Sequence, residues 1–482
     1  MHAERGQAQL HAELHPPRHR RAPGQTGWCR HLAPRPRRFL DALFHGSRPL
    51  PPDPPGIEQI APTRKRPGGA IRSRNTARAA FASRRPDSDS AGVTPIEHIR
   101  GFQDQLTAWR RDFHAHPETG FEEHRTAALV AQRLASWGIE VHRGIGRTGL
   151  VGVLRNGHGN RAIGLRADMD ALDMPEANGF AHRSTVPGKM HGCGHDGHTT
   201  MLLGAARYLA ETRRFDGIVH FIFQPAEEGQ GGALAMLEDG LFRRFPCDAI
   251  YALHNRPGLP VGHYAIRPGA MMAGCAFFDL AIEGRGGHAA RPESTVDPVV
   301  CGAQIVSAWQ SIVGRNVAPN DTAVISVTGF SAGTAYNVIP AQVALRGTVR
   351  AFRAETMRLL EARMRALAES IAAGFGGTAR LEFREVTVPV VNAPEQTAMI
   401  ADAAAAMVGE ARVDRDRIAA MGSEDFSWMM AERPGAYMLV GNGEGEGSCE
   451  VHNPGYDFND AAIPYGAGLL AAVVERELPQ GV

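Results

Sequence analysis

The stretch GIVHFIFQPAEE, residues 217–228, decides the fold of this chain. Its first seven residues form a nearly continuous apolar run, the pattern of a strand in a parallel sheet that is buried on both faces. The run stops at Gln224 and Pro225, and two adjacent carboxylates, Glu227 and Glu228, follow. We therefore expect a parallel sheet covered by helices, with acidic groups just past the end of one strand.

Two further segments also stop just before a side chain that can bind a metal ion, and a third is followed by a Gly-rich loop that leads to one. Ligands of open α/β sheets bind outside the carboxyl ends of the strands, so groups far apart in sequence can meet at one edge. These segments and side chains are residues 163–167 with Asp168 and Asp170, residues 248–253 with His254, and residues 436–440 with His452.

Residues 191–198, His-Gly-Cys-Gly-His-Asp-Gly-His, concentrate potential metal ligands. Imidazole and thiolate bind zinc and similar ions, and the interleaved glycines allow a tight loop. The sequence has no C-x-x-C pair of the kind that structural zinc sites favour, so an open catalytic site is the better prediction. A buried helix is expected directly behind this loop, with Thr199 as its N-cap.

Seven motifs occur in order between about residue 97 and the C-terminus, and together they resemble the M20 metallopeptidase family. The resemblance is to its amidohydrolases, which include hippurate hydrolases, N-acyl-amino-acid deacylases and auxin-conjugate hydrolases. The motifs lie at residues 168–170, 191–198, 224–229, 253–255, 286–292, 422–426 and 451–454.

The resemblance implies two divalent ions, Mn²⁺ or Zn²⁺, beside a free general base. Glu227 is expected to be that base, taking a proton from the attacking water and returning it to the departing amine. Two adjacent carboxylates repel each other, and an ion on Glu228 relieves that repulsion. The implied ion ligands are Cys193, His195, Glu228, His254 and His452.

Other residues receive supporting roles from the same resemblance. Asp168 and Asp170 are expected to hold a ligand histidine or the base from behind. His288 is expected to stabilise the oxyanion, a role that in the resembled family often comes from a neighbouring subunit. Asn337 and Arg350 are expected to grip the carboxylate of the substrate.

Four polar side chains within these motifs receive no firm role. We leave His191 and His198 out of the ion ligands, because a short loop rarely lets every histidine coordinate. Glu424 and Asp425 either support His452, line the cleft, or form a simple acidic pair at a helix start.

Residues 273–390 have a different pattern, with strands expected at 277–282, 322–330, 343–352 and 381–390 and helices at 295–314 and 354–374. The order β-α-β-β-α-β is typical of the ferredoxin-like fold. The segment interrupts a catalytic domain made of residues 96–272 and 391–482, which marks it as an inserted lid. We therefore predict an α/β protein, a metal-binding α/β/α sheet domain with an inserted ferredoxin-like α+β domain, through which the resembled family commonly forms dimers.

Residues 1–95 differ in composition from the rest of the chain. They carry 17 Lys and Arg but 7 Asp and Glu, so residues 96–482 carry a net charge of −9 within a total of +1. This Arg- and Pro-rich leader is expected to be disordered, or translation starts near residue 93. The acidic remainder does not suggest nucleic-acid binding, and no apolar segment is long enough for a bilayer. Six cysteines without framework spacing fit a reducing, cytoplasmic setting.

The sequence favours a two-metal amidohydrolase that cleaves N-acyl amino acids such as hippurate, N-acetyl or indoleacetyl conjugates. One alternative is a non-catalytic metal- or ligand-binding protein on the same scaffold. Another is a metal-independent thiol hydrolase with Cys193 as nucleophile. Metal content separates the thiol mechanism from the two-metal mechanism.

Overall fold

The computed structural model describes residues 93–445 and 449–481. The predicted disordered leader, residues 1–95, lies outside the described residues except at its end. There Thr94 is the N-cap of helix α1 (Pro95–Arg100) and forms a reciprocal capping box with Glu97. The folded part therefore includes residues 93–95, which the prediction assigned to the leader.

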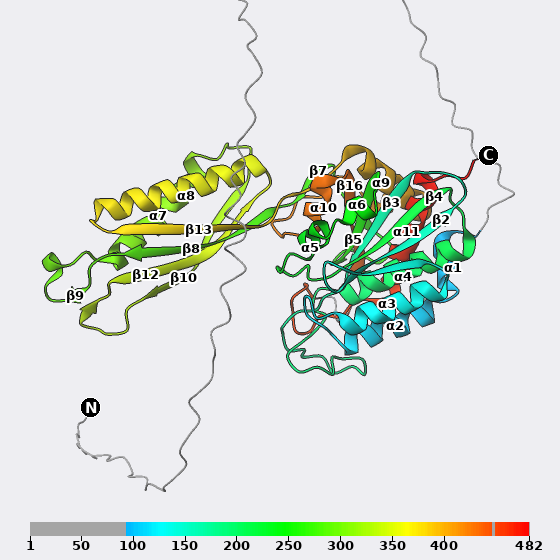
Figure 1. Ribbon diagram of the computed structural model, residues 1–482, viewed down its shortest axis with the longest axis horizontal. Helices are drawn as coiled ribbons and strands as arrows, with labels where there is room; N and C mark the ends of the chain where they lie inside the picture. The colour runs from blue at the N-terminus through cyan, green and yellow to red at the C-terminus, as the bar shows by residue number, and fades with distance from the viewer. Residues whose placement is uncertain (1–92, 446–448, 482) are drawn as a thin grey trace, which may run out of the picture. The chain divides into compact units, whose positions relative to one another are not determined.

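An eight-stranded sheet forms the centre of the larger domain (Figure 1). In the order in which they lie, its strands are β1 (Glu140–Ile145), β2 (Gly149–Asn156), β4 (Gly217–Gln224), β3 (Ala162–Asp168), β5 (Ala249–Pro257), β16 (Gly435–Gly443), β6 (Tyr264–Ala265) and β15 (Val413–Asp414). The four central strands β4, β3, β5 and β16 pair in parallel, and they contain the four apolar segments predicted as strands. The predicted parallel core is thus confirmed.

Helices cover both faces of this sheet. In β4, Val219, Phe221 and Phe223 pack into the core on one face, while Ile222 packs into the core on the other. Successive side chains of a strand point to opposite faces, which is why a doubly covered strand is apolar at nearly every position. The first face is covered by α1, α2 (Gln103–Ala115), α3 (His124–Ser136), α4 (His195–Thr212), α9 (Pro394–Val408) and α11 (Ile463–Glu477). The second face is covered by α5 (Gly232–Glu238), α6 (Leu241–Arg244) and α10 (Phe426–Glu432).

No helix of the described residues is long and apolar enough to cross a bilayer.

The inserted domain has the predicted β-α-β-β-α-β order. Its antiparallel sheet has the strand order β10-β12-β8-β13, and both helices pack into one core with it. This confirms the ferredoxin-like fold. The elements are β8 (Gly274–Glu283), α7 (Pro298–Arg315), β10 (Ala323–Ala332), β12 (Gln342–Ala351), α8 (Ala354–Gly374) and β13 (Thr378–Thr387), with a small ribbon of β9 (Gly287–His288) and β11 (Val338–Ile339).

The two connections to the insertion hydrogen-bond to each other. β7 (Gly269–Met272) enters the insertion, β14 (Val390–Asn392) leaves it, and the two pair antiparallel. The insertion is therefore attached through one short two-stranded ribbon rather than through two independent linkers.

Candidate metal centre

The parallel strands bring several of the predicted site residues to one edge of the sheet. β3 ends at Asp168, and β4 ends at Gln224, shortly before Glu227. His254 was expected to follow the end of its strand, but β5 continues to Pro257. The strand is longer because β16 keeps pairing with β5 beyond His254, which itself lies opposite Leu439.

The ligand loop leads directly into α4. The helix begins at His195, not behind the predicted N-cap Thr199, and Gly194 is its N-cap. Gly194 has a φ of 95°, and a Cβ there would lie 2.4 Å from Asn255 Oδ1, so only glycine fits. The Thr199 hydroxyl instead donates to the Asp168 carbonyl at 2.8 Å, which ties the helix to the end of β3.

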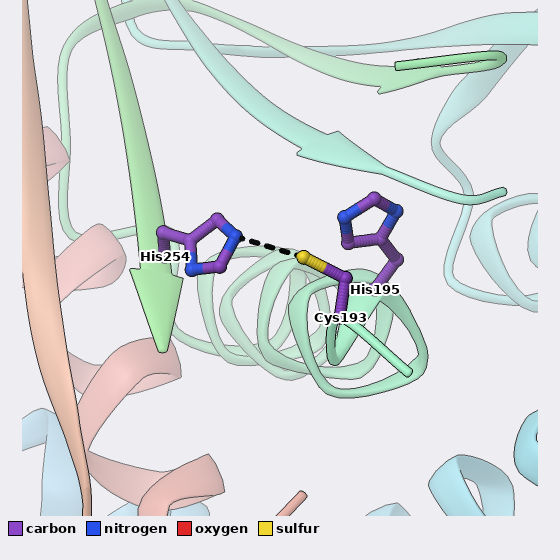
Figure 2. A group of neighbouring side chains, drawn as sticks. All are labelled: Cys193, His195 and His254. Atoms are coloured by element: carbon purple, nitrogen blue, oxygen red, sulfur yellow. Dashed lines mark hydrogen bonds between the residues drawn. The ribbon is translucent and has the colours of Figure 1, made fainter. Parts of the chain in front are cut away.

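Cys193, His195 and His254 form a first ligand group, with one donor atom of each within 4.8 Å of the others (Figure 2). Cys193 Sγ lies 3.4 Å from His254 Nε2. His254 Nδ1 donates to the Asn255 carbonyl at 2.7 Å, and His195 Nδ1 lies 3.3 Å from Asp170 Oδ1. Such partners fix an imidazole from behind and leave its other nitrogen for an ion.

Cys193, Glu228 and His452 form a second ligand group of the same size. His452 Nε2 lies 3.0 Å from Glu228 Oε1. The backbone of His452 is left-handed, with a φ of 63°, and its N–H donates to the Gly192 carbonyl at 2.7 Å. Because Cys193 belongs to both groups, together they make one centre suited to two neighbouring ions.

The chemistry of these donors fits divalent cations. His195 Nε2 is buried and has no hydrogen-bond partner among the described residues. Burial, with a contribution from Glu228, raises the pKa of the Cys193 thiol, and hydrogen bonds with Cys193 and Glu228 raise the pKa of His452 to about 10. Ion binding requires the thiolate and the neutral imidazole, and a divalent ion supplies the positive charge that favours both forms.

Glu227 lies at the border of the ligand groups. Its carboxylate is within 4.8 Å of donor atoms of His195 and Glu228 on one side and of Glu424 and Asp425 on the other. Burial and the neighbouring carboxylates hold its pKa well above the ordinary value. A carboxylate with a raised pKa beside an ion centre has the properties of a general base.

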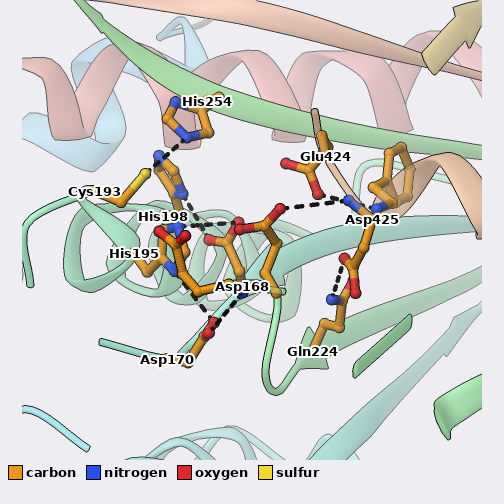
Figure 3. A network of polar contacts seen from close by, with 12 residues as sticks. Asp168, Asp170, Cys193, His195, His198, Gln224, His254, Glu424 and Asp425 are labelled. Carbon is orange, nitrogen blue, oxygen red and sulfur yellow. Dashed lines mark hydrogen bonds and ion pairs between the residues drawn. The ribbon is translucent and has the colours of Figure 1, made fainter. Parts of the chain in front are cut away.

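Arg166 is a residue of the site that the sequence interpretation missed. It lies within β3 and is only 2% exposed. Nη1 donates to Asp168 at 2.8 Å, Nη2 donates to Glu424 at 2.8 Å, and Nε donates to Gln224 at 2.9 Å. Gln224 Nε2 in turn donates to Asp425 Oδ1 at 2.6 Å (Figure 3). An arginine inside a strand with apolar neighbours on both sides was the available signal, because such a charge needs buried acidic partners.

Among the described residues, Glu424 and Asp425 form no hydrogen bond or ion pair with His452, so the first role considered for them is not supported. Both are buried, and Glu424 pairs with Arg166 instead. Asp425 accepts the Ala233 N–H at 2.9 Å and directly precedes α10, but it is not an exposed helix-start acid. Glu424 lines the cavity beside the ligand groups, which was the second role considered.

The model of Peptidase family M20/M25/M40 matches residues 164–476 of this chain. The protein belongs to this family. Relatives of this M20 protein include the hippurate hydrolase of Campylobacter jejuni, which is 39% identical over 80% of this chain and 99% of the relative. The IAA-amino acid hydrolase ILR1-like 4 of Arabidopsis thaliana is 38% identical over 78% of this chain and 86% of its own.

A solved relative supports the architecture of this M20 protein. A dinuclear metal binding peptidase of the family from Bacillus subtilis superposes with a TM-score of 0.69 and 33% identity, covering 78% of this chain and 98% of that one. The family and these relatives identify the M20 protein as a metal-dependent amidohydrolase.

Two loop histidines of the M20 protein lie outside the ligand groups we infer. His198 Nδ1 lies 2.6 Å from Asp168 Oδ1, and its Nε2 lies 2.6 Å from Asn255 Oδ1, so protein groups contact both nitrogens. His191 is buried with no hydrogen-bond partner for either nitrogen among the described residues. Burial lowers its pKa to about 4, which keeps this ring neutral.

A cavity of about 600 Å³ lies beside the ion centre of the M20 protein. Arg350, in β12 of the inserted domain, lines it together with apolar side chains such as Met271 and Phe277. The cavity is thus bounded by both domains. The predicted site residues that line it are Cys193, Glu227, Glu228, His254, His452 and Arg350.

His288 and Asn337 do not line this cavity. His288 lies in β9 opposite Val338, is exposed, and accepts the Ala290 N–H through Nδ1 at 3.0 Å. The Asn337 carbonyl accepts the Ala289 N–H at 3.0 Å, so the two predicted residues are neighbours on one small ribbon. The structure thus places His288 and Asn337 next to each other, outside the lining of the cavity.

Proposed function

We propose that this protein hydrolyses the amide bond of N-acyl amino acids and releases a carboxylic acid and a free amino acid. The observation that carries this proposal is the convergence of five candidate ligands, Cys193 and four residues around it, with Glu227 beside them. The names of the relatives, a hippurate hydrolase and an IAA-amino acid hydrolase, support this substrate class. We expect Mn²⁺ or Zn²⁺ as the ions.

In the proposed reaction, Glu227 acts as general base and then as general acid. When bound, the two ions supply Lewis acidity, lowering the pKa of the attacking water and polarising the substrate carbonyl. The Glu227 carboxylate accepts a proton from the attacking water and later donates it to the leaving nitrogen. Asp170 holds His195 and Asp168 holds His198, which keeps the imidazole rings oriented.

Arg350 and Asn337 complete the site by binding the substrate carboxylate, and His288 stabilises the oxyanion. Arg350 fits this role because it lines the cavity and a guanidinium can form paired hydrogen bonds with a carboxylate. Since His288 and Asn337 share an exposed ribbon outside the cavity lining, we propose that a second subunit of a homodimer delivers both. The free thiols of the described residues agree with the reducing, cytoplasmic setting that we propose.

Removal of the ions should abolish hydrolysis. We expect turnover of hippurate, N-acetylated amino acids and indoleacetyl amino acids to fall to background in excess chelator and to return when Mn²⁺ or Zn²⁺ is added. Elemental analysis of the active protein should find two ions per chain. Full turnover in excess chelator would instead favour Cys193 as nucleophile, although burial raises the pKa of that thiol and so opposes a free thiolate.

Mixing two inactive variants tests whether His288 acts across subunits. His288→Ala and Glu227→Gln should each be inactive alone. If the subunits exchange, a heterodimer has one site with both native groups, so the mixture should recover about a quarter of wild-type activity. His288→Ala mixed with Arg350→Ala gives a second complementing pair, because Arg350 belongs to the subunit that holds the ions. Absence of recovery in heterodimers verified by differential tagging would place His288 in its own subunit's site.

A further inference from the structure

The turn that carries Glu227 and Glu228 has a strained backbone. Ala226, the residue before them, is fully buried and has a φ of 51°, in the left-handed region that a non-glycine residue seldom adopts. The position of both glutamates depends on this turn, because Ala226 sets the direction in which the chain leaves β4. A conformation of this kind persists only where its surroundings hold it in place.

A buried carboxylate from another part of the chain holds this turn. Glu123 is the N-cap residue of α3 and is 0% exposed. Its Oε1 accepts the Ala226 N–H at 2.9 Å, and its Oε2 accepts the Thr148 hydroxyl. Each oxygen of this carboxylate thus has a donor, and one of the donors is the strained residue itself.

The backbone around Glu123 is itself anchored beside the ion centre. The Glu118 carbonyl accepts the Ala171 N–H at 2.8 Å, so the segment that precedes α3 pairs with the chain just past Asp170. Asp170 Oδ2 in turn accepts the Glu228 N–H at 3.0 Å. Two buried carboxylates therefore hold the same turn at two amides, one on each side of Glu227.

We infer that Glu123 is a positioning residue of the active site, which fixes Glu227 and Glu228 by holding the Ala226 amide in its left-handed turn. The expected effect on kcat rests on the proposed function. Glu123 does not line the cavity and is absent from the ion-ligand groups, so it acts through the backbone of the turn. Loss of Glu123 should therefore displace Glu227 and Glu228 while leaving the wall of the cavity intact.

Truncation of Glu123 should lower both ion affinity and turnover. We expect Glu123→Ala to weaken Mn²⁺ binding to the apoprotein by about 10- to 100-fold in calorimetry, and to lower kcat by a similar factor with little change in KM. Glu123→Gln should remain close to wild type, because its amide oxygen can accept the Ala226 N–H and its NH₂ can donate to the Thr148 hydroxyl. Thr148→Val removes the other hydrogen bond and is the matched control, expected to retain ion affinity.

A second substitution separates positioning from general stability. Glycine adopts positive φ without strain, so Ala226→Gly should restore much of the ion affinity and kcat that Glu123→Ala loses, while changing the wild-type protein little. Circular dichroism and thermal melting of each variant establish that it is folded. Unchanged Mn²⁺ affinity in Glu123→Ala, failure of Glu123→Gln to preserve it, or no rescue by Ala226→Gly would each overturn the inference. Because calorimetry needs no substrate, this result stands apart from whether the protein hydrolyses N-acyl amino acids.

Discussion

Glu227→Gln should lower kcat by about 10²- to 10⁴-fold, the range expected when a general base is lost. The amide has nearly the same shape as the carboxylate, so the Asp425 N–H, 3.4 Å from Glu227 Oε1, keeps an acceptor. The amide cannot accept a proton at neutral pH, and this alone removes the proposed proton transfer. The measurement is the steady-state rate of hippurate hydrolysis by the ion-loaded variant.

The adjacent Glu228 provides the matched comparison. Glu228→Gln should lose ion affinity, because this residue belongs to a ligand group with Cys193 and His452. Glu227→Gln should retain two ions per chain by elemental analysis. Wild-type turnover of Glu227→Gln with both ions bound would contradict the role of Glu227 as base.

Arg166→Met should lower the free energy of unfolding by about 3–5 kcal/mol, the range for removal of one partner from a buried ion network. Arg166 contacts Asp168, Glu424 and Asp425, all buried, and its loss leaves these carboxylates without their cation. Methionine fills much of the space, so the effect reports mainly on charge. Urea unfolding followed by circular dichroism measures the change.

An exposed arginine serves as the control for Arg166. Arg384 pairs with Asp279 at 2.7 Å on the inserted sheet, where the two side chains are 52% and 50% exposed. Arg384→Met should cost no more than about 1 kcal/mol, because water screens such a pair. If Arg166→Met were as stable as this control, the buried network would not need its arginine.

The sequence could predict the parallel core because hydrophobic pattern and strand burial are directly linked. A doubly covered strand such as β4 must be largely apolar on both faces, and this leaves a nearly continuous apolar run that ends where polar groups begin. The inserted domain was equally predictable, since its four strands and two helices follow one another in a known order. Strand ends were less predictable, as at His254, because pairing with a neighbouring strand decides where a strand stops.

The sequence reveals the candidate ion ligands more readily than the residues that support them. Cys193 and His195 lie in a dense motif. Arg166 was marked only by its place in an apolar strand, and Glu123 looks like an ordinary polar residue until the fold supplies its partners. The Thr199 prediction failed for a related reason. Threonine is a common N-cap, but Gly194 already turns the chain into α4 with a φ of 95°.

One sulfur atom serves both ligand groups, and this has a consequence for the durability of the catalyst. We expect oxidation of Cys193 to a sulfinic or sulfonic acid to remove the thiolate from both candidate ligand groups in a single irreversible event. Both proposed ion positions therefore depend on the same thiolate, and peroxide damage that releases one ion should also release the other.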